Sequence, residues 1–172
     1  MIDLDVWLSA HLIGPGAEAA AWLTHLGEPL LALPLLAAGL FWLHGAAEAK
    51  RRIRRVALAG LVLLVLVQGG KRLINRPRPG AQIATYANLP GGHLRGHAFP
   101  SGHTAFGAFV AGSLMIHPVS LGLRGLLLLY AIVVGWSRVA MGAHWPSDVL
   151  AGMTLGFLLA FMGQPRHRER PS

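Results

Sequence analysis

The sequence contains no cysteine, which excludes disulfide bonds, thiolate metal sites and cysteine nucleophiles. Charged residues are also scarce: they make up 13% of the 172 residues, whereas hydrophobic residues make up 53%. A soluble domain of this length does not need so much apolar sequence to fill its core. The composition therefore predicts an integral membrane protein with a single domain, residues 1–172.

The start of the chain lacks the basic residues of a secretory signal, because Asp3 and Asp5 stand in their place. We therefore expect no cleaved signal peptide. Residues 2–13 mix apolar and polar positions over a stretch too short to span a bilayer, and they predict a short amphipathic helix at the membrane interface.

Long apolar runs predict an all-α fold, a polytopic membrane helix bundle of about five transmembrane helices. The expected spans are 22–43, 53–70, 101–116, 121–136 and 147–162. The third and fourth are short, since sixteen residues rise about 24 Å against a hydrocarbon core of about 30 Å. We expect the polar ends of these two helices to lie at or slightly below one membrane surface.

Basic residues orient the predicted bundle. With five spans, nine of them fall on one face, which the positive-inside rule assigns to the cytoplasm. These nine are Lys50, Arg51, Arg52, Arg54, Arg55, Arg124, Arg166, Arg168 and Arg170. The tail 163–172 is then cytoplasmic and the loop 71–100 lies outside. No nucleic-acid partner is expected, because the densest basic cluster is wedged between two spans.

Six other basic residues fall on the outer face, where topology does not explain them: Lys71, Arg72, Arg76, Arg78, Arg95 and Arg138. The first group of interest runs from Lys71 to Pro79. Its prolines stiffen the backbone, and arginine forks match phosphate oxygens, while lysine supplies a compact charge. Taken alone, this group is also typical of a basic loop that binds anionic headgroups loosely.

The second group is Phe99-Pro100-Ser101-Gly102-His103-Thr104. Ser101 is a candidate N-cap, and the small Gly102 lets an anion approach the exposed backbone amides. His103 lies in the first turn, where it could donate a proton to a bound group. An ordinary capped helix with a hydrogen-bonded histidine is the simpler interpretation of this group alone.

The third group places Arg138, His144 and Asp148 between two apolar segments, where ionisable residues are costly unless they serve a site. Pro146 suits the first turn of the last span, so we expect His144 just before a helix N-terminus and Asp148 inside the first turn. The spacing lets Asp148 reach one imidazole nitrogen and leaves the other free as nucleophile or base. A structural pair that closes a helix junction is the alternative.

Together the three groups supply what phosphoryl transfer needs: cations around the phosphate oxygens, a group to attack in line and a group to protonate the leaving oxygen. Their order and spacing resemble the three-part signature of the type 2 phosphatidic acid phosphatases, which are relatives of the vanadium haloperoxidases. The matching pattern is Lys71, six residues, Arg78-Pro79; Pro100-Ser101-Gly102-His103; and Ser137-Arg138, five residues, His144, three residues, Asp148.

The resemblance implies a metal-independent lipid phosphatase without a cofactor. It implies that Lys71, Arg78 and Arg138 hold the phosphate, together with Ser101 and the Gly102 amide. It further implies that His144 attacks to form a phosphohistidine, that Asp148 orients it, and that His103 protonates the leaving group and then activates water. Many membrane members of the family have six spans, so a six-helix variant stays open.

Two residues of the outer loop, Arg95 and His97, are candidates for headgroup contact. The spacing of His93, His97 and His103 could suggest a metal site, but Gly91, Gly92 and Gly96 argue against the helix that such spacing needs, and we expect no metal.

The expected function is hydrolysis of a membrane lipid phosphate or pyrophosphate in a bacterial inner membrane, with the site on the periplasmic or extracellular face. Undecaprenyl pyrophosphate is favoured over phosphatidate or phosphatidylglycerophosphate. Two alternatives remain, a lipid phosphotransferase with the same site and a non-enzymatic lipid-binding or scaffold protein. The sequence does not indicate an oligomeric state.

Overall fold

The computed structural model describes residues 2–13 and 16–163, and within these ranges the regular structure is entirely helical. The helices are α1 (Ile2–Leu12), α2 (Ala17–Leu23), the short 3-10 helix η1 (Thr24–Gly27), α3 (Pro29–Ile74), α4 (Pro79–Gln82), α5 (Ala84–Ala87), α6 (Gly102–Met115), α7 (Leu121–Ala140) and α8 (Pro146–Met162). The predicted all-α class is confirmed. Of the predicted tail 163–172, only Gly163 is described, so Arg166, Arg168 and Arg170 lie outside the described residues.

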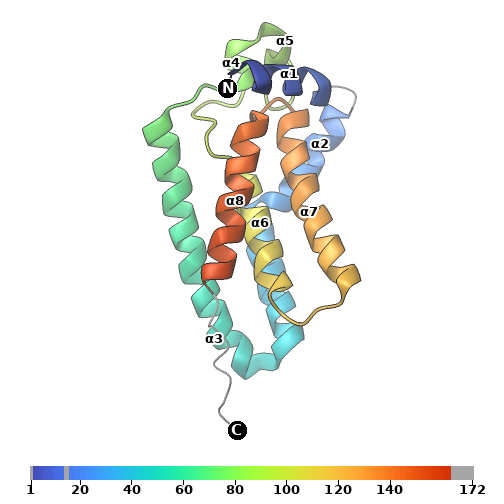
Figure 1. The fold of residues 1–172 in the computed structure, drawn as a ribbon, viewed down its shortest axis with the longest axis vertical. Helices are drawn as coiled ribbons and strands as arrows, with labels where there is room; N and C mark the ends of the chain where they lie inside the picture. The colour runs from blue at the N-terminus through green and yellow to red at the C-terminus, as the bar shows by residue number, and fades with distance from the viewer. Residues whose placement is uncertain (1, 14–15, 164–172) are drawn as a thin grey trace.

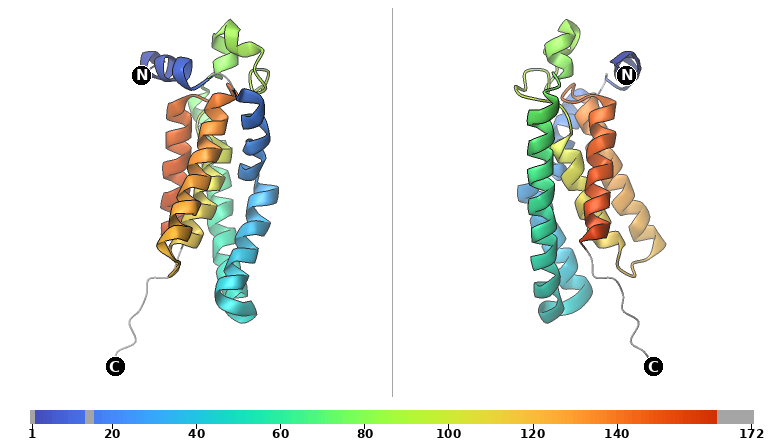
Figure 2. Two further views of the ribbon diagram at one scale, coloured as in Figure 1. Left: turned by 90° about the vertical axis from the view of Figure 1, so that its right-hand side faces the viewer. Right: turned by 60° about the vertical axis from the view of Figure 1, so that its left-hand side comes forward.

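The long helices lie side by side in an elongated bundle (Figures 1 and 2). Helix α3 turns back on itself at one end, so that its two arms run in opposite directions. Helices α1, α4 and α5 lie at the other end, and α1 runs across the bundle there. The two arms of α3 correspond to the first two predicted spans.

The first predicted span, 22–43, is not one straight helix. It is broken at Glu28, which is extended (φ −72°, ψ 134°), and the segments Ala17–Gly27 and Pro29–Leu43 meet at a bend of 53°. Proline disfavours helical geometry in the residue before it, so Pro29 starts a new helix and leaves Glu28 extended.

The second span extends beyond its predicted end at Gly70. Helix α3 continues to Ile74, so Lys71 lies in its last turn and not in the outer loop. Asn75 ends the helix in the left-handed conformation (φ 50°, ψ 36°), which asparagine tolerates, and its amide bonds to the Lys71 carbonyl. Pro77 then prevents the helix from resuming.

The prediction that the fourth helix is short was wrong. Helix α7 has 20 residues and continues through Ser137 and Arg138 to Ala140. These polar residues do not end the helix because their side chains are hydrogen-bonded within the fold: the Ser137 hydroxyl donates to the Val134 carbonyl, and Arg138 donates to Thr24. Helix α6, with 14 residues, is short as predicted.

Two described segments are long and apolar enough to cross a membrane alone, Arg52–Gln82 and Leu121–Ala140. A third forms if the bent pair Ala17–Gly27 and Pro29–Leu43 counts as one span. The count of five spans therefore remains a prediction.

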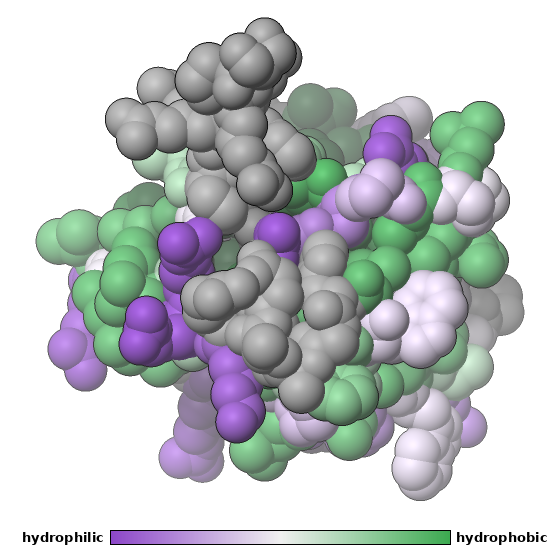
Figure 3. Space-filling model, turned by 90° about the horizontal axis from the view of Figure 1, so that it is seen from below, coloured by the Kyte–Doolittle hydropathy of each residue, from purple (hydrophilic) through white to green (hydrophobic). Residues whose placement is uncertain are grey.

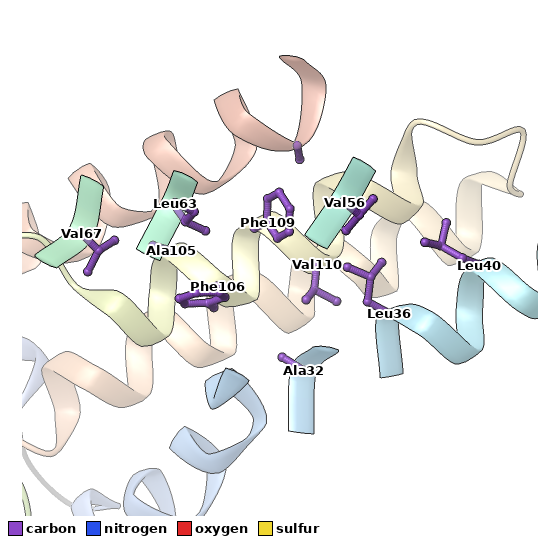
Figure 4. Packing of buried hydrophobic residues seen from close by; sticks show 11 residues of the cluster. Ala32, Leu36, Leu40, Val56, Leu63, Val67, Ala105, Phe106, Phe109 and Val110 are labelled. Carbon is purple, nitrogen blue, oxygen red and sulfur yellow. The ribbon is translucent and has the colours of Figure 1, made fainter. Parts of the chain in front are cut away.

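The main core lies between the two arms of α3 and helix α6 (Figure 4). Leu36 from the first arm and Leu63 from the second are buried with Phe109 of α6. By contrast, many large apolar side chains on the outside of the bundle are exposed, among them Leu30 and Leu121, each at 85%. An outer surface rich in exposed apolar side chains suits contact with the hydrocarbon of a membrane.

The turn of α3 and the start of α7 lie at the same end of the bundle. The described basic residues of that end are Lys50, Arg52, Arg54, Arg55 and Arg124. Figure 3, viewed from this end, shows hydrophilic residues clustered beside hydrophobic ones. The segments that carry the three polar groups lie toward the opposite end (Figure 1), as the charge pattern predicts.

Two small residues of α8, Gly152 and Gly156, let α6 and α8 approach closely. A Cβ added at Gly152 would meet the Ser101 carbonyl oxygen, and one at Gly156 would meet the Ala105 carbonyl oxygen and lie 2.9 Å from the Phe109 nitrogen. Backbone atoms cannot move aside as a flexible side chain can. The start of α8 is thereby held against the start of α6.

We predict that Gly156→Ala destabilises the protein by about 1–3 kcal/mol, because the added methyl group must push two helix backbones apart. The matched control is Gly125→Ala in α7, where nothing lies within 4 Å of the added Cβ. Thermal unfolding in detergent, followed by circular dichroism, measures both. Equal midpoints for the two variants would contradict the close packing of α6 against α8.

Candidate active site

The three polar groups of the sequence come together beneath the end of the bundle that carries α1, α4 and α5. The chain descends from α5 to the start of α6, which begins below the tops of α7 and α8 (Figures 1 and 2). The Ser101 amide donates to the Asp148 carbonyl oxygen at 3.0 Å, which joins the second group directly to the third. The site is therefore recessed within the bundle.

His144 and Asp148 lie at the start of α8. Trp145 is the N-cap and is extended (φ −75°, ψ 153°), and Pro146 opens the helix. The Asp148 Oδ2 atom accepts the Trp145 amide at 2.9 Å and lies 3.7 Å from His144 Nδ1. That separation exceeds a hydrogen bond, but a shift of less than about 1 Å would form one.

Arg78 approaches the other ring nitrogen of His144. Its Nη1 atom donates to the Ala143 carbonyl oxygen at 2.7 Å and lies 3.4 Å from His144 Nε2. Arg78 is buried, with 8% of the residue exposed. Lys71, half-buried at the end of α3, directs its Nζ atom to the His97 carbonyl oxygen at 3.4 Å.

Arg138 is held from the last turn of α7. The residue is 4% exposed, and its Nη1 atom donates to the Thr24 hydroxyl and lies 3.3 Å from the Met141 sulfur. Its carbonyl oxygen accepts the amides of Ala143 and His144, both at 3.1 Å. The loop after α7 therefore folds back and carries His144 over the arginine.

The two buried arginines have neutral partners where a carboxylate would usually stand. Arg78 donates to the Ala143 carbonyl and Arg138 to the Thr24 hydroxyl, and the Nε atoms of both arginines are buried without a hydrogen-bond partner. Burying a charge is costly unless it is paired. Within the described residues, this arrangement indicates a site for an anion with several acceptor oxygens, such as phosphate.

The start of α6 faces the same place. Ser101 is the N-cap by position, but its hydroxyl pairs with the Thr104 hydroxyl at 3.0 Å and caps no backbone amide. The first-turn amides of a helix have no partner within the helix, so those at Gly102 and His103 suit an anion. His103 lies close enough to Arg138, His144 and Lys71 to interact with them electrostatically.

Burial, followed by the positive charges of Arg138, Arg78 and Lys71, holds the pKa of His144 well below its usual value. The imidazole is therefore neutral at physiological pH. A neutral ring retains a lone pair on one nitrogen, which is the form that a nucleophile or a base requires.

The candidates for headgroup contact lie farther out. Arg95 is exposed and His97 half-buried, and both line, with Arg78, an outer cavity of about 430 Å³. Across residues 2–13 and 16–163, no three His, Cys, Asp or Glu side chains are grouped as metal ligands.

Three contacts of the site were not predicted. Arg76 donates to Asp148 Oδ1 at 2.7 Å and to Asp5 at 2.6 Å, and Thr24 accepts from Arg138. Arg76 had one sequence signal, because it is among the outer-face cations that topology does not explain. Asp5 and Thr24 carried no such signal, since they are far from these partners along the chain.

Comparison with known proteins identifies relatives over most of the chain. The model of the PAP2 superfamily matches residues 36–169. The Escherichia coli K12 protein named "Putative undecaprenyl-diphosphatase YbjG" is 31% identical over 86% of this chain and 75% of its own length.

Two solved structures share the fold. Aquifex aeolicus LpxE superposes with a TM-score of 0.77 at 27% identity, covering 93% of this chain and 94% of the other. The transmembrane PAP2 type phosphatidylglycerolphosphate phosphatase from Bacillus subtilis gives 0.68 at 29% identity, covering 94% and 83%.

We predict that Arg78→Lys weakens binding of inorganic phosphate about 10- to 100-fold, because lysine cannot bond both Ala143 and an anion with a planar fork. Isothermal titration calorimetry of the detergent-purified protein measures the affinity. Arg72→Lys is the control, since Arg72 is exposed in the last turn of α3, six residues before Arg78. Wild-type affinity in Arg78→Lys would show that the buried guanidinium does not bind the anion.

Proposed function

The chain belongs to the PAP2 superfamily of membrane lipid phosphatases, and from this premise we propose that it hydrolyses a lipid phosphate or pyrophosphate through a phosphohistidine at His144. The observation that carries the mechanism is the setting of this histidine. It is 1% exposed, with Nδ1 3.7 Å from the Asp148 carboxylate and Nε2 3.4 Å from Arg78.

In the first step, Lys71, Arg78 and Arg138 hold the phosphate oxygens, with the amides at the start of α6. With its proton on Nδ1, His144 attacks phosphorus through the Nε2 lone pair. The nitrogen–phosphorus bond forms as the bond to the leaving oxygen breaks, and His103 gives that oxygen a proton. The ring gains positive charge, which the Asp148 carboxylate balances.

In the second step, His103 has lost its proton and can accept one from water. The water oxygen attacks phosphorus, the nitrogen–phosphorus bond breaks, and the imidazole recovers its lone pair. Inorganic phosphate leaves, and both histidines return to their starting states. No group from outside the chain is needed except water.

A lipid substrate is supported by an apolar cleft between the two arms of α3 and helix α6. The cleft has a volume of about 640 Å³, and its lining includes Leu36, Ile53 and Phe106. Phe106 lies three residues, about one helical turn, beyond His103. A hydrocarbon chain in this cleft would bring its phosphate toward the recessed site.

Among lipid phosphates we favour undecaprenyl pyrophosphate, which the name of the E. coli relative supports. We also propose five spans with the site on the periplasmic or extracellular face of a bacterial inner membrane. The basic residues at the turn of α3, on the end away from the site, support this orientation through the positive-inside rule. The outer segment 71–100, which begins with the last turn of α3, then covers the site, and the tail 163–172 is cytoplasmic.

We predict that His144→Ala lowers phosphate release by about 1,000-fold or more, since it removes the imidazole that forms the covalent bond in the proposed mechanism. Purified protein in detergent with a water-soluble lipid phosphate is sufficient for the assay. His93→Ala is the control, because this exposed histidine of the outer loop hydrogen-bonds to the Ala87 carbonyl oxygen and has no role in the proposed mechanism. Full activity in His144→Ala would exclude the proposed mechanism.

A substrate panel tests the lipid. We expect undecaprenyl pyrophosphate to give a higher kcat/KM than phosphatidate or phosphatidylglycerophosphate, measured as free phosphate released without an added acceptor lipid. Release that depends on an acceptor lipid would identify a phosphotransferase. A preference for either glycerol-based lipid would contradict the favoured substrate and leave the phosphohistidine mechanism in place.

A further inference from the structure

Arg76 connects helix α1 to the start of α8 at the site. Its Nη1 atom donates to Asp148 Oδ1 at 2.7 Å, and its Nη2 atom donates to Asp5 Oδ2 at 2.6 Å. The guanidinium also lies over the ring of Trp145, with its carbon 5.5 Å from the ring centroid. One side chain thus bridges the carboxylate beside the nucleophile and a carboxylate of α1.

Asp5 makes a second connection to α8. Its Oδ1 atom accepts the Ser147 amide at 2.9 Å, and its Oδ2 atom accepts the Ser147 hydroxyl at 2.6 Å. Ser147 lies in the first turn of α8, where backbone amides have no partner within the helix. A carboxylate at this position also suits the positive end of the helix dipole. Asp5 therefore caps α8 from another helix.

Helix α1 presents its polar side to the protein. Asp5 and Ser9 are buried, whereas Leu4 and Trp7 are exposed at 62% and 59%. Burial alone would raise the pKa of Asp5, but the hydrogen bonds from Arg76 and Ser147 hold it below its usual value. Asp5 is therefore ionised at neutral pH and keeps its ion pair with Arg76.

We propose that Asp5 and Arg76 are positioning residues for the nucleophile. Asp5 fixes Arg76, and Arg76 fixes Oδ1 of Asp148, which leaves Oδ2 directed at His144. The inference rests on the proposed role of His144. Asp5 lies outside residues 36–169, the part of the chain that the family model matches.

The charges of the bridge predict how the loss of Asp5 changes the rate of attack by His144. With Asp5 present, the positive charge of Arg76 is shared between two carboxylates. Without it, Arg76 acts on Asp148 alone and reduces the negative charge available to the His144 imidazole as the covalent bond forms. The phosphate ligands Lys71 and Arg78 make none of these contacts, so attack should slow while substrate binding is unaffected.

The first test is Asp5→Asn, which keeps the size and an acceptor for the Ser147 amide but removes the charge. We expect kcat to fall about 10-fold with KM unchanged. Asp5→Glu should recover much of the rate, because it restores the charge. Glu18→Gln is the control, since it removes an exposed carboxylate of α2 and should leave kcat unchanged.

The second test is a double-mutant cycle with Arg76→Lys, which keeps the charge but cannot bridge both carboxylates. If Asp5 acts through Arg76, adding Asp5→Asn to Arg76→Lys lowers kcat little further. Three results would each overturn the inference: a double variant whose loss in kcat is the product of the two single losses, a change confined to KM, or a wild-type kcat in Asp5→Asn. The thermal unfolding midpoints of all variants are measured alongside, and they identify any loss of kcat that is caused by unfolding. If Asp5→Asn is unfolded, the kcat of Asp5→Glu in the folded protein decides the question.

His144→Ala, assayed in the same series, separates this inference from the proposed function. An active His144→Ala overturns the phosphohistidine mechanism itself. An inactive His144→Ala together with a normal Asp5→Asn overturns only the role of the Asp5–Arg76 bridge.

Discussion

Two guanidiniums buried against neutral partners are the constraint on which the site depends. Arg78 is anchored to a carbonyl oxygen and Arg138 to a hydroxyl, and neither of these hydrogen bonds supplies a negative charge. Desolvating an ion costs several kcal/mol even after the protein relaxes. The fold carries this cost, and an anionic ligand that satisfies the buried Nε atoms offsets it. The proposed binding of phosphate would therefore relieve a cost that lowers the stability of the free protein.

The helices bring the reacting groups together through backbone contacts. Gly152 and Gly156 let α8 lie against the carbonyl groups of α6, and the Ser101 amide bonds to the Asp148 carbonyl. Two segments far apart in the sequence are thereby fixed near each other. The bridge from Arg76 to Asp5 adds two more segments, so three parts of the chain, at Asp5, Arg76 and Ser101, hold the start of α8.

Much of the site was predictable because its signals are local. Pro146 determines where α8 begins, and the spacing from His144 to Asp148 then follows from helix geometry. The length of α7 was not predictable from composition, since Ser137 and Arg138 read as the end of a span until their hydrogen bonds are known. Pro29 is a local signal for the break at Glu28, but the apolar run 22–43 favoured a single helix. The contact of Asp5 with Arg76 depends on tertiary packing across most of the chain, and no local pattern predicts it.

The central claim is that His144 forms a covalent bond to phosphorus, and trapping that bond tests it most directly. The protein is mixed with a lipid substrate labelled in the phosphate that is released, quenched in alkali within the first turnover, and digested for mass spectrometry. The account predicts a phosphoryl group on the peptide that contains His144, stable in alkali and lost in acid. Rapid release of phosphate with no label on that peptide, or a label on another residue, would contradict it.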